Sequence, residues 1–288
     1  MSKKKASEEE KSVLEQFMLP FYHVSKRVPL FPGKNNMASE AGLFGISEEE
    51  LEKYRENYEE NAKEAALEIL KEDEIVDCLD DIPMDGEETI VAFGDSNTED
   101  AQGWFTILKH VLEISVEKAN FKFINAGVSY NTTAEALRRI DRDVVIHEPD
   151  WVIVALGTFD AQRLNIAPNR TLLPLSETWE NIETIQAVLG ERVDNPLIWI
   201  TPAPVISEML EENLLYDFTI KPKDLGQVQE LVAGKQGAII DGRAERMGED
   251  EPNAWNYLPD GLHHSLSGHM ETVKAIIKKL TEPKEPKS

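Results

Sequence analysis

The chain has 288 residues, of which 54 are acidic and 30 are basic, so its formal net charge is -24. This length allows either one ordinary domain with an appendage or two small domains, and the rest of the sequence favours the first. A charge of this sign repels nucleic-acid phosphates and anionic lipid head groups over much of the surface. We therefore expect no nucleic-acid partner, and neutral or cationic substrates fit better than anionic ones.

The single cysteine, Cys78, excludes a disulfide within the chain. Residues 1–11 are charged and polar with no apolar stretch behind them, so we do not expect them to act as a secretory signal. The sequence also contains no run of 18 apolar residues that could span a membrane. These features predict a cytoplasmic protein that does not insert into a membrane.

The first region, residues 1–86, is charged and prone to form helices, and we place a domain boundary at its end. Within it, Ser47 and Glu50 form a capping box that opens a predicted helix over residues 48–71. Residues 17–44 hold scattered apolar residues between prolines and glycines, which predicts an extended arm wrapped over a neighbouring surface. That surface belongs either to the same chain or to a second subunit. In the second case the extension would form a homo-oligomer, and both alternatives are kept.

The second region, residues 87–288, alternates short apolar runs with amphipathic helical patterns. The apolar runs are rich in Val, Ile and Phe and predict buried parallel strands at residues 89–93, 121–125, 151–156, 197–201 and 238–241. Helices are predicted at residues 104–118, 133–147, 176–189, 205–233 and 267–280. This alternation predicts an α/β fold, a three-layer α/β/α sandwich around a five-stranded parallel sheet. Ligands of such sheets bind beyond the carboxyl ends of the strands.

A serine follows the first predicted strand in the sequence Gly94-Asp95-Ser96-Asn97. A hydroxyl on this turn lies at the edge of the sheet where chemistry is expected, although Asp95 or Ser96 could instead merely cap a helix. The sequence is not the Gly-x-Ser-x-Gly elbow, because Thr98 stands where the second glycine would be.

A serine nucleophile needs a base, and position favours His263 among the six histidines. His263 lies between the last predicted strand and the last helix, in the sequence Pro259-Asp260-Gly261-Leu262-His263. Asp260, three residues earlier, could accept a hydrogen bond from the imidazole and fix its tautomer. His264 is the rival base, but it lacks this three-residue offset.

These segments resemble the conserved blocks of the SGNH (GDSL-like) hydrolases. Gly94-Asp95-Ser96-Asn97 is similar to the first block, Asn125-Ala126-Gly127 to the glycine block, and Asp260-Gly261-Leu262-His263 to the last block. The resemblance covers residues 88–281 with the blocks in the right order, and it implies the flavodoxin-like fold of that family. The first 86 residues have no counterpart in the family's common core.

The resemblance implies a serine ester hydrolase that works through an acyl-enzyme intermediate. Ser96 would attack the acyl carbonyl, His263 would act as general base and then acid, and Asp260 would orient His263. The backbone N–H groups of Ser96 and Gly127 would donate hydrogen bonds to the oxyanion.

The sequence departs from the family at its third block, which is normally Gly-x-Asn-Asp and supplies a side-chain donor to the oxyanion. Here the block reads Gly157-Thr158-Phe159-Asp160, and phenylalanine cannot donate a hydrogen bond. Losing one such donor typically lowers the rate by about 10² to 10³. Gln162 or Asn97 could supply a replacement amide, or Phe159 simply lines the substrate pocket.

Ester hydrolysis of a small-molecule acyl ester, either short-chain or acetylated, is the leading interpretation. A non-catalytic binding protein on the same fold and an acyltransferase to an acceptor other than water are the alternatives. The sequence has no Cys/His cluster, no histidine pair at metal spacing and no glycine-rich phosphate loop. It therefore implies neither a metal nor another cofactor.

Overall fold

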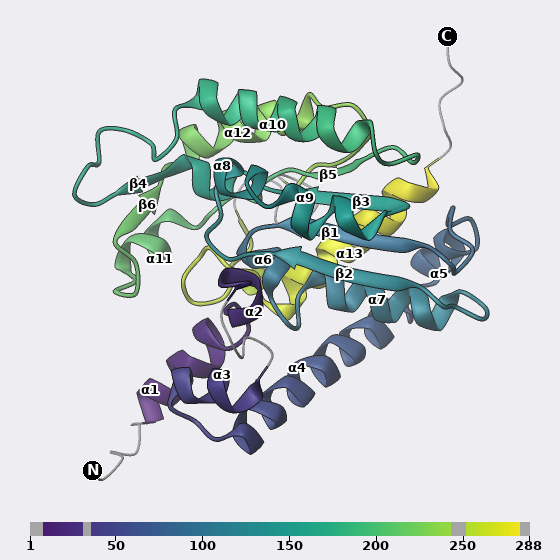
Figure 1. Ribbon diagram of the computed structural model, residues 1–288, viewed down its shortest axis with the longest axis horizontal. Coiled ribbons are helices and arrows are strands. Elements are labelled where there is room, and N and C mark those ends of the chain that lie inside the picture. The colour runs from purple at the N-terminus through teal and green to yellow at the C-terminus, as the bar shows by residue number, and fades with distance from the viewer. Residues whose placement is uncertain (1–7, 31–35, 243–251, 283–288) are drawn as a thin grey trace.

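A computed structural model describes residues 8–30, 36–242 and 252–282 of the chain (Figure 1). In chain order its strands are β1 (Thr89–Gly94), β2 (Lys122–Gly127), β3 (Trp151–Ala155), β4 (Gln162–Leu164), β5 (Ile198–Ile200), β6 (Phe218–Ile220) and β7 (Ala238–Ile240). The helices of the core region are α6 (Ser96–Glu99), α7 (Trp104–Ser115), α8 (Thr133–Leu137), α9 (Ile140–Asp143), α10 (Leu175–Gly190), α11 (Ser207–Glu212), α12 (Pro222–Ala233) and α13 (Leu266–Thr281). Short 3-10 turns lie at Val145–His147, Thr158–Ala161 and Ala254–Asn256.

Five strands form one parallel sheet in the order β2-β1-β3-β5-β7. This is the flavodoxin-like order, and the five predicted strands all occur at the predicted places. Because all five strands are parallel, the loops after β1, β2 and β3 lie at the same carboxyl edge of the sheet. The order of the strands reverses beside β1, which places these three loops next to one another. The predicted α/β sandwich with a parallel sheet is therefore confirmed.

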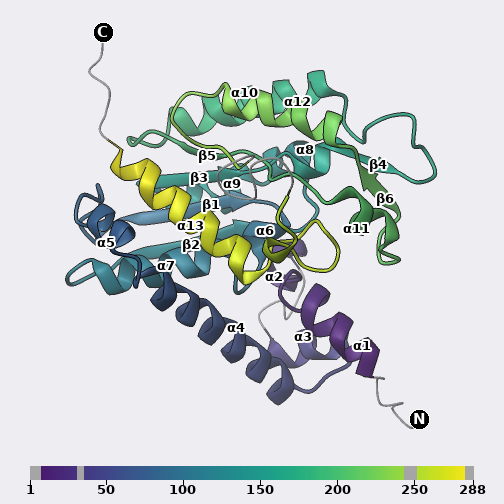
Figure 2. The same ribbon diagram turned by 180° about the vertical axis from the view of Figure 1, so that it is seen from behind.

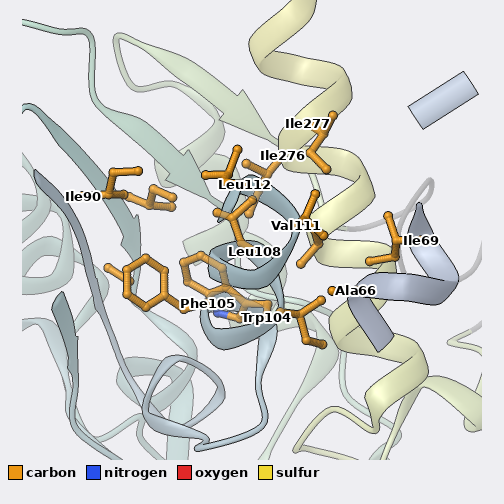
Figure 3. Close-up of a cluster of buried hydrophobic side chains, with 14 of the residues drawn as sticks. Ala66, Ile69, Ile90, Trp104, Phe105, Leu108, Val111, Leu112, Ile276 and Ile277 are labelled. Atoms are coloured by element: carbon orange, nitrogen blue, oxygen red, sulfur yellow. The ribbon is translucent and has the colours of Figure 1, made fainter. Parts of the chain in front are cut away.

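Helices cover both faces of the sheet, with α8, α9, α10 and α12 on one face and α7 and α13 on the other (Figures 1 and 2). Alternate strand residues separate the two cores. Val91 and Phe93 of β1 pack towards α10, whereas Ile90 and Ala92 pack towards α7 and α13. Figure 3 shows the second of these cores, in which aromatic and branched side chains of α7 meet α13.

The N-terminal region is α1 (Glu8–Val13), a π-helical turn (Leu14–Met18), α2 (Val24–Arg27), α3 (Met37–Phe44), α4 (Glu48–Ile69) and α5 (Asp73–Leu79). The predicted capping box opens α4, which packs against α7 and shares its apolar core with α7 and α13. The prediction of an extended conformation over residues 17–44 is wrong where α2 and α3 are helical, but residues 21–27 of this segment do pack on the core of the same chain. The boundary near residue 86 stays a prediction.

Two predicted helices are interrupted. Residues 205–233 contain α11, the strand β6 and α12, and β6 pairs with β4 in a separate antiparallel ribbon. Residues 133–147 break at Arg139, whose buried guanidinium donates to the carbonyl oxygens of Gly94 (2.9 Å) and Ala126 (2.6 Å) at the ends of β1 and β2. None of the helices in the described ranges is long and apolar enough to cross a membrane.

Candidate active site

Ser96 lies immediately beyond the carboxyl end of β1, as the first residue of α6. Asp95 caps this helix, since its Oδ1 accepts a hydrogen bond from the Asn97 N–H at 3.3 Å. Burial raises the pKa of the Asp95 carboxyl to about 7. Ser96 is fully buried, and its Oγ accepts a hydrogen bond from the backbone N–H of Tyr130 at 3.0 Å.

His263 and Asp260 form a buried pair in the loop before α13, with 2.6 Å between Nδ1 of the imidazole and Oδ2 of the carboxylate. The other oxygen of Asp260 accepts from the backbone N–H groups of Leu262 and His263, each at 3.0 Å. Although burial raises the pKa of Asp260, the charge and hydrogen bond of His263 lower it below its usual value overall. The structure thus brings together the two residues that the sequence paired.

The second imidazole nitrogen of His263, Nε2, is buried and has no hydrogen-bond partner among the described residues. Tyr130 contacts both residues. Its backbone N–H donates to Ser96 Oγ, and the centroid of its ring lies 6.0 Å from that of the His263 ring. No hydrogen bond joins His263 Nε2 to Ser96 Oγ in this structure, so Nε2 keeps a lone pair that is free to accept a proton.

Sequence reasoning missed two tyrosines that border this pair. The Tyr216 hydroxyl donates to Asp260 Oδ2 at 2.8 Å and lies 3.4 Å from His263 Nδ1. Tyr130 adopts a left-handed backbone conformation with φ of 63°, which aims its N–H at Ser96 Oγ. A tyrosine in this conformation is uncommon, and its residue type alone gave no signal of the role.

The structure does not place the Gly127 N–H at the serine. That N–H donates to Asn125 Oδ1 at 2.9 Å, within the same segment. Gly127 instead allows β2 to approach α6, because a Cβ on it would lie 2.3 Å from the backbone nitrogen of Glu99. The backbone donor beside Ser96 Oγ is therefore Tyr130, three residues further along the chain.

Phe159, which replaces the family's asparagine, is buried in an apolar cluster. Its ring packs edge-on against Tyr130, with 5.2 Å between centroids. The Asn97 side-chain amide is held by its oxygen, because its Oδ1 accepts from the backbone N–H of His264 at 2.9 Å. Gln162 lines a neighbouring pocket together with Tyr130 and Tyr216.

The fold is a flavodoxin-like α/β sandwich, and Ser96, Asp260 and His263 all lie beyond the carboxyl ends of its parallel strands. Residues 92–270 match the model of the GDSL-like lipase/acylhydrolase family, and the chain belongs to that family. Membership supports an enzyme that hydrolyses esters.

Solved structures with this fold include a lipase/acylhydrolase from Enterococcus faecalis, which is 24% identical with a TM-score of 0.55 over 70% of this chain and 99% of that one. The acetylxylan esterase Axe2 from Geobacillus stearothermophilus is 18% identical, with a TM-score of 0.53 over 68% of this chain and 96% of the other. LAE5, an alpha/beta hydrolase enzyme from the metagenome of Lake Arreo, is 18% identical with a TM-score of 0.54 and the same coverage. At these identities the likeness establishes the fold.

One curated relative is an uncharacterized lipoprotein, YqeF, of Bacillus subtilis (strain 168). It is 37% identical over 86 residues, which are 26% of this chain. The match spans 33% of the length of that relative.

Proposed function

We propose that the chain hydrolyses a small, uncharged acyl ester with Ser96 as nucleophile, His263 as general base and acid, and Asp260 as the residue that orients His263. The observation that carries the proposal is the buried pair of Asp260 and His263, which leaves the Nε2 atom of His263 unpaired. Asp260 fixes the tautomer in which Nδ1 carries the proton, so Nε2 keeps a free lone pair for the serine proton.

In the first half of the reaction, Ser96 Oγ attacks the acyl carbon while its proton passes to His263 Nε2. The tetrahedral intermediate then collapses as His263 gives that proton to the departing alcohol, which leaves an ester between the acyl group and Ser96. Water attacks this ester in the second half, with His263 again taking and returning the proton. Asp260 remains ionised throughout and stabilises the imidazolium by its charge.

Two backbone N–H groups support the oxyanion in this proposal, those of Ser96 and Tyr130. The first N–H groups of a helix have no acceptor within the helix, and Ser96 begins α6. Tyr130 N–H already lies within hydrogen-bond distance of Ser96 Oγ. Because Phe159 occupies the place of a third donor, we expect slower turnover than a complete hole would give.

The proposed substrate carries a short acyl group such as acetyl. Support comes from the burial of Ser96 and from two apolar rings in the same region, since Phe21 packs on His263 and Phe159 packs on Tyr130. An acetyl group is also the one named for the acetylxylan esterase with the same fold. The acidic surface disfavours an anionic substrate.

The test is labelling with a fluorophosphonate followed by mass-spectrometric mapping of the modified residue. We expect an adduct on Ser96 that disappears in Ser96→Ala and slows by about 10² or more in His263→Ala. The matched control is His264→Ala, which removes the neighbouring imidazole and should retain labelling. An adduct on another serine, or no adduct on folded protein, would refute the assignment.

Phe159 is the observation that favours a second candidate, a binding protein that has kept the site without turnover. An adduct on Ser96 with no detectable hydrolysis of activated acetyl esters would support that candidate over hydrolysis. Acyl transfer, the third reading, would appear as an acylated acceptor alcohol formed in preference to free acid.

A further inference from the structure

Residues 17–27 of the N-terminal region lie against the candidate site, from the opposite end of the sequence. Phe21 is fully buried, and its ring lies 4.4 Å from the ring of His263, between centroids. Its carbonyl oxygen accepts a hydrogen bond from Ser129 Oγ at 2.7 Å, one residue before Tyr130. Figures 1 and 2 both place the following helix, α2, beside α6.

The same segment forms one side of a pocket of about 340 Å³. Phe17, Met18 and Tyr22 line it from the N-terminal region, and Tyr130 and Tyr216 line it from the core. These two tyrosines hydrogen-bond to Ser96 and Asp260, so the pocket is separated from the candidate catalytic residues by one layer of side chains. Its walls are mainly aromatic, and Asp217 is the carboxylate among them, which suits an uncharged group with apolar faces.

Buried polar contacts fix the segment to the core. Glu99, whose side chain is fully buried on α6, accepts from the backbone N–H and the Nδ1 of His23, each at 3.1 Å, and from the backbone N–H of Ser129. Although burial raises the pKa of Glu99, the hydrogen bond of His23 and the charge of Lys26 lower it overall. Releasing the segment would leave a buried carboxylate unpaired, which is strongly unfavourable.

A second set of contacts ties α2 to the end of β2. Lys26 Nζ donates to Asn125 Oδ1 at 2.9 Å and to the carbonyl oxygen of Gly127 at 3.1 Å. The guanidinium of Arg27 donates to the carbonyl oxygen of Ser129 at 3.1 Å and lies over the Tyr22 ring, 4.1 Å from its centroid. These bonds hold Tyr22 in place at the pocket, so the segment has the contacts of a fixed wall.

We propose that residues 17–22 are a permanent wall of the substrate pocket and that Met18 and Tyr22 determine the size of the uncharged substrate group that the enzyme accepts. This inference rests on the proposed ester hydrolysis, because it assigns the specificity of the same site. It makes the N-terminal region a contributor to substrate selection.

The experiment compares fluorophosphonates with a short and a long alkyl chain, and measures the rate at which each labels Ser96 by intact mass. We expect Tyr22→Ala and Met18→Ala to raise the ratio of long-chain to short-chain labelling by about tenfold or more, because a pocket discriminates by roughly that factor for each methylene it admits or rejects. Tyr22→Phe keeps the ring and should keep the wild-type ratio. Val28→Ala, an exposed position beyond the wall, is the matched control.

Each outcome separates the two proposals. Labelling at Ser96 with an unchanged ratio in both alanine variants would overturn the wall and leave the hydrolase intact. A rise for both probes by the same factor would also overturn it, because it would identify residues 17–22 as a cover over the site. Absence of labelling at Ser96 in folded wild-type protein would overturn the proposed function and the inference with it.

Discussion

The Tyr216 hydroxyl donates a hydrogen bond to Asp260 at 2.8 Å, on the same carboxylate oxygen that bonds to His263. Asp260 therefore receives hydrogen bonds from a side-chain hydroxyl, an imidazole and two backbone N–H groups. A carboxylate with this many donors has a fixed orientation, and so does the imidazole that it holds. Tyr216 is in this sense a positioning residue.

We predict that Tyr216→Phe lowers kcat by about tenfold with little change in KM, since a hydrogen bond to a charged group contributes roughly 1.5–3 kcal/mol and only part of it is felt in the transition state. Steady-state kinetics on an activated acetyl ester would measure this. Tyr58→Phe is the control, because it removes a hydroxyl that donates to the Glu15 carbonyl far from the site. Equal losses in both variants would argue against positioning by Tyr216.

Phe159→Asn should have opposite effects on stability and rate. Loss of a buried aromatic side chain typically costs about 3–5 kcal/mol, so the free energy of unfolding should fall. An amide at this position would restore a donor to the oxyanion, and we expect kcat to rise about tenfold at temperatures where the variant is folded. Leu225→Asn, in the same buried cluster, should lose stability without the gain in rate. A variant as slow as wild type would indicate that the amide does not reach the oxyanion.

Asp95 gives the protein a pH dependence of stability. Its pKa is raised by burial to about 7 in the folded chain, above the usual 3.8, so the folded state binds the proton more tightly than the unfolded state does. The contribution of this group to the free energy of unfolding is therefore fully present below about pH 4 and is lost as the pH rises through 7, by at most roughly 4 kcal/mol.

Urea unfolding at several pH values would measure this effect in wild type and in Asp95→Asn. The variant should gain stability relative to wild type as the pH rises from about 5 to about 8, a range that brackets the raised pKa of Asp95. Asp73→Asn, at an exposed carboxylate, should follow the wild-type curve. A constant difference between Asp95→Asn and wild type over this range would contradict the raised pKa.

Gly127→Ala should destabilise the fold, because the new Cβ would meet backbone atoms of Thr98 and Glu99 on α6 at 2.6 and 2.3 Å. Overpacking of this kind typically costs about 1–3 kcal/mol, and here it would also displace the helix that carries Ser96. Gly42→Ala in α3 has open space around the new Cβ and should be neutral or slightly stabilising. Thermal unfolding of both variants provides the comparison, and equal melting temperatures would refute the close contact.

The sheet was predictable because its strands are buried on both faces and appear as short runs of Val, Ile and Phe. The ribbon of β4 and β6 was not predicted, since each strand has three residues. The alternation of Tyr216, Phe218 and Ile220 before Pro222 did carry a period-two signal, which the surrounding helical pattern obscured. The break near Arg139 depends on carbonyl groups distant in sequence, and no local pattern reveals it.

The site was predictable where chemistry restricts the residue type. Serine, histidine and aspartate are few at the ends of strands, so Ser96, His263 and Asp260 could be selected, and their catalytic roles stay predictions. The backbone N–H of Tyr130 is a group that every residue except proline has, so its role follows from conformation alone. Tyr216 and Phe21 reach the site through tertiary packing, which the sequence does not display.

The contact between Phe21 and His263 determines when, during synthesis of the chain, the candidate site can be completed. Residue 21 leaves the ribosome long before residue 263 has been synthesised, so the aromatic side chains at its end of the chain have no catalytic loop to pack against during most of translation. Contacts between residues so far apart in sequence also close the largest loop and form slowly. Catalytic competence should therefore be acquired late, after the sheet has assembled, in the final docking of the two ends of the polypeptide.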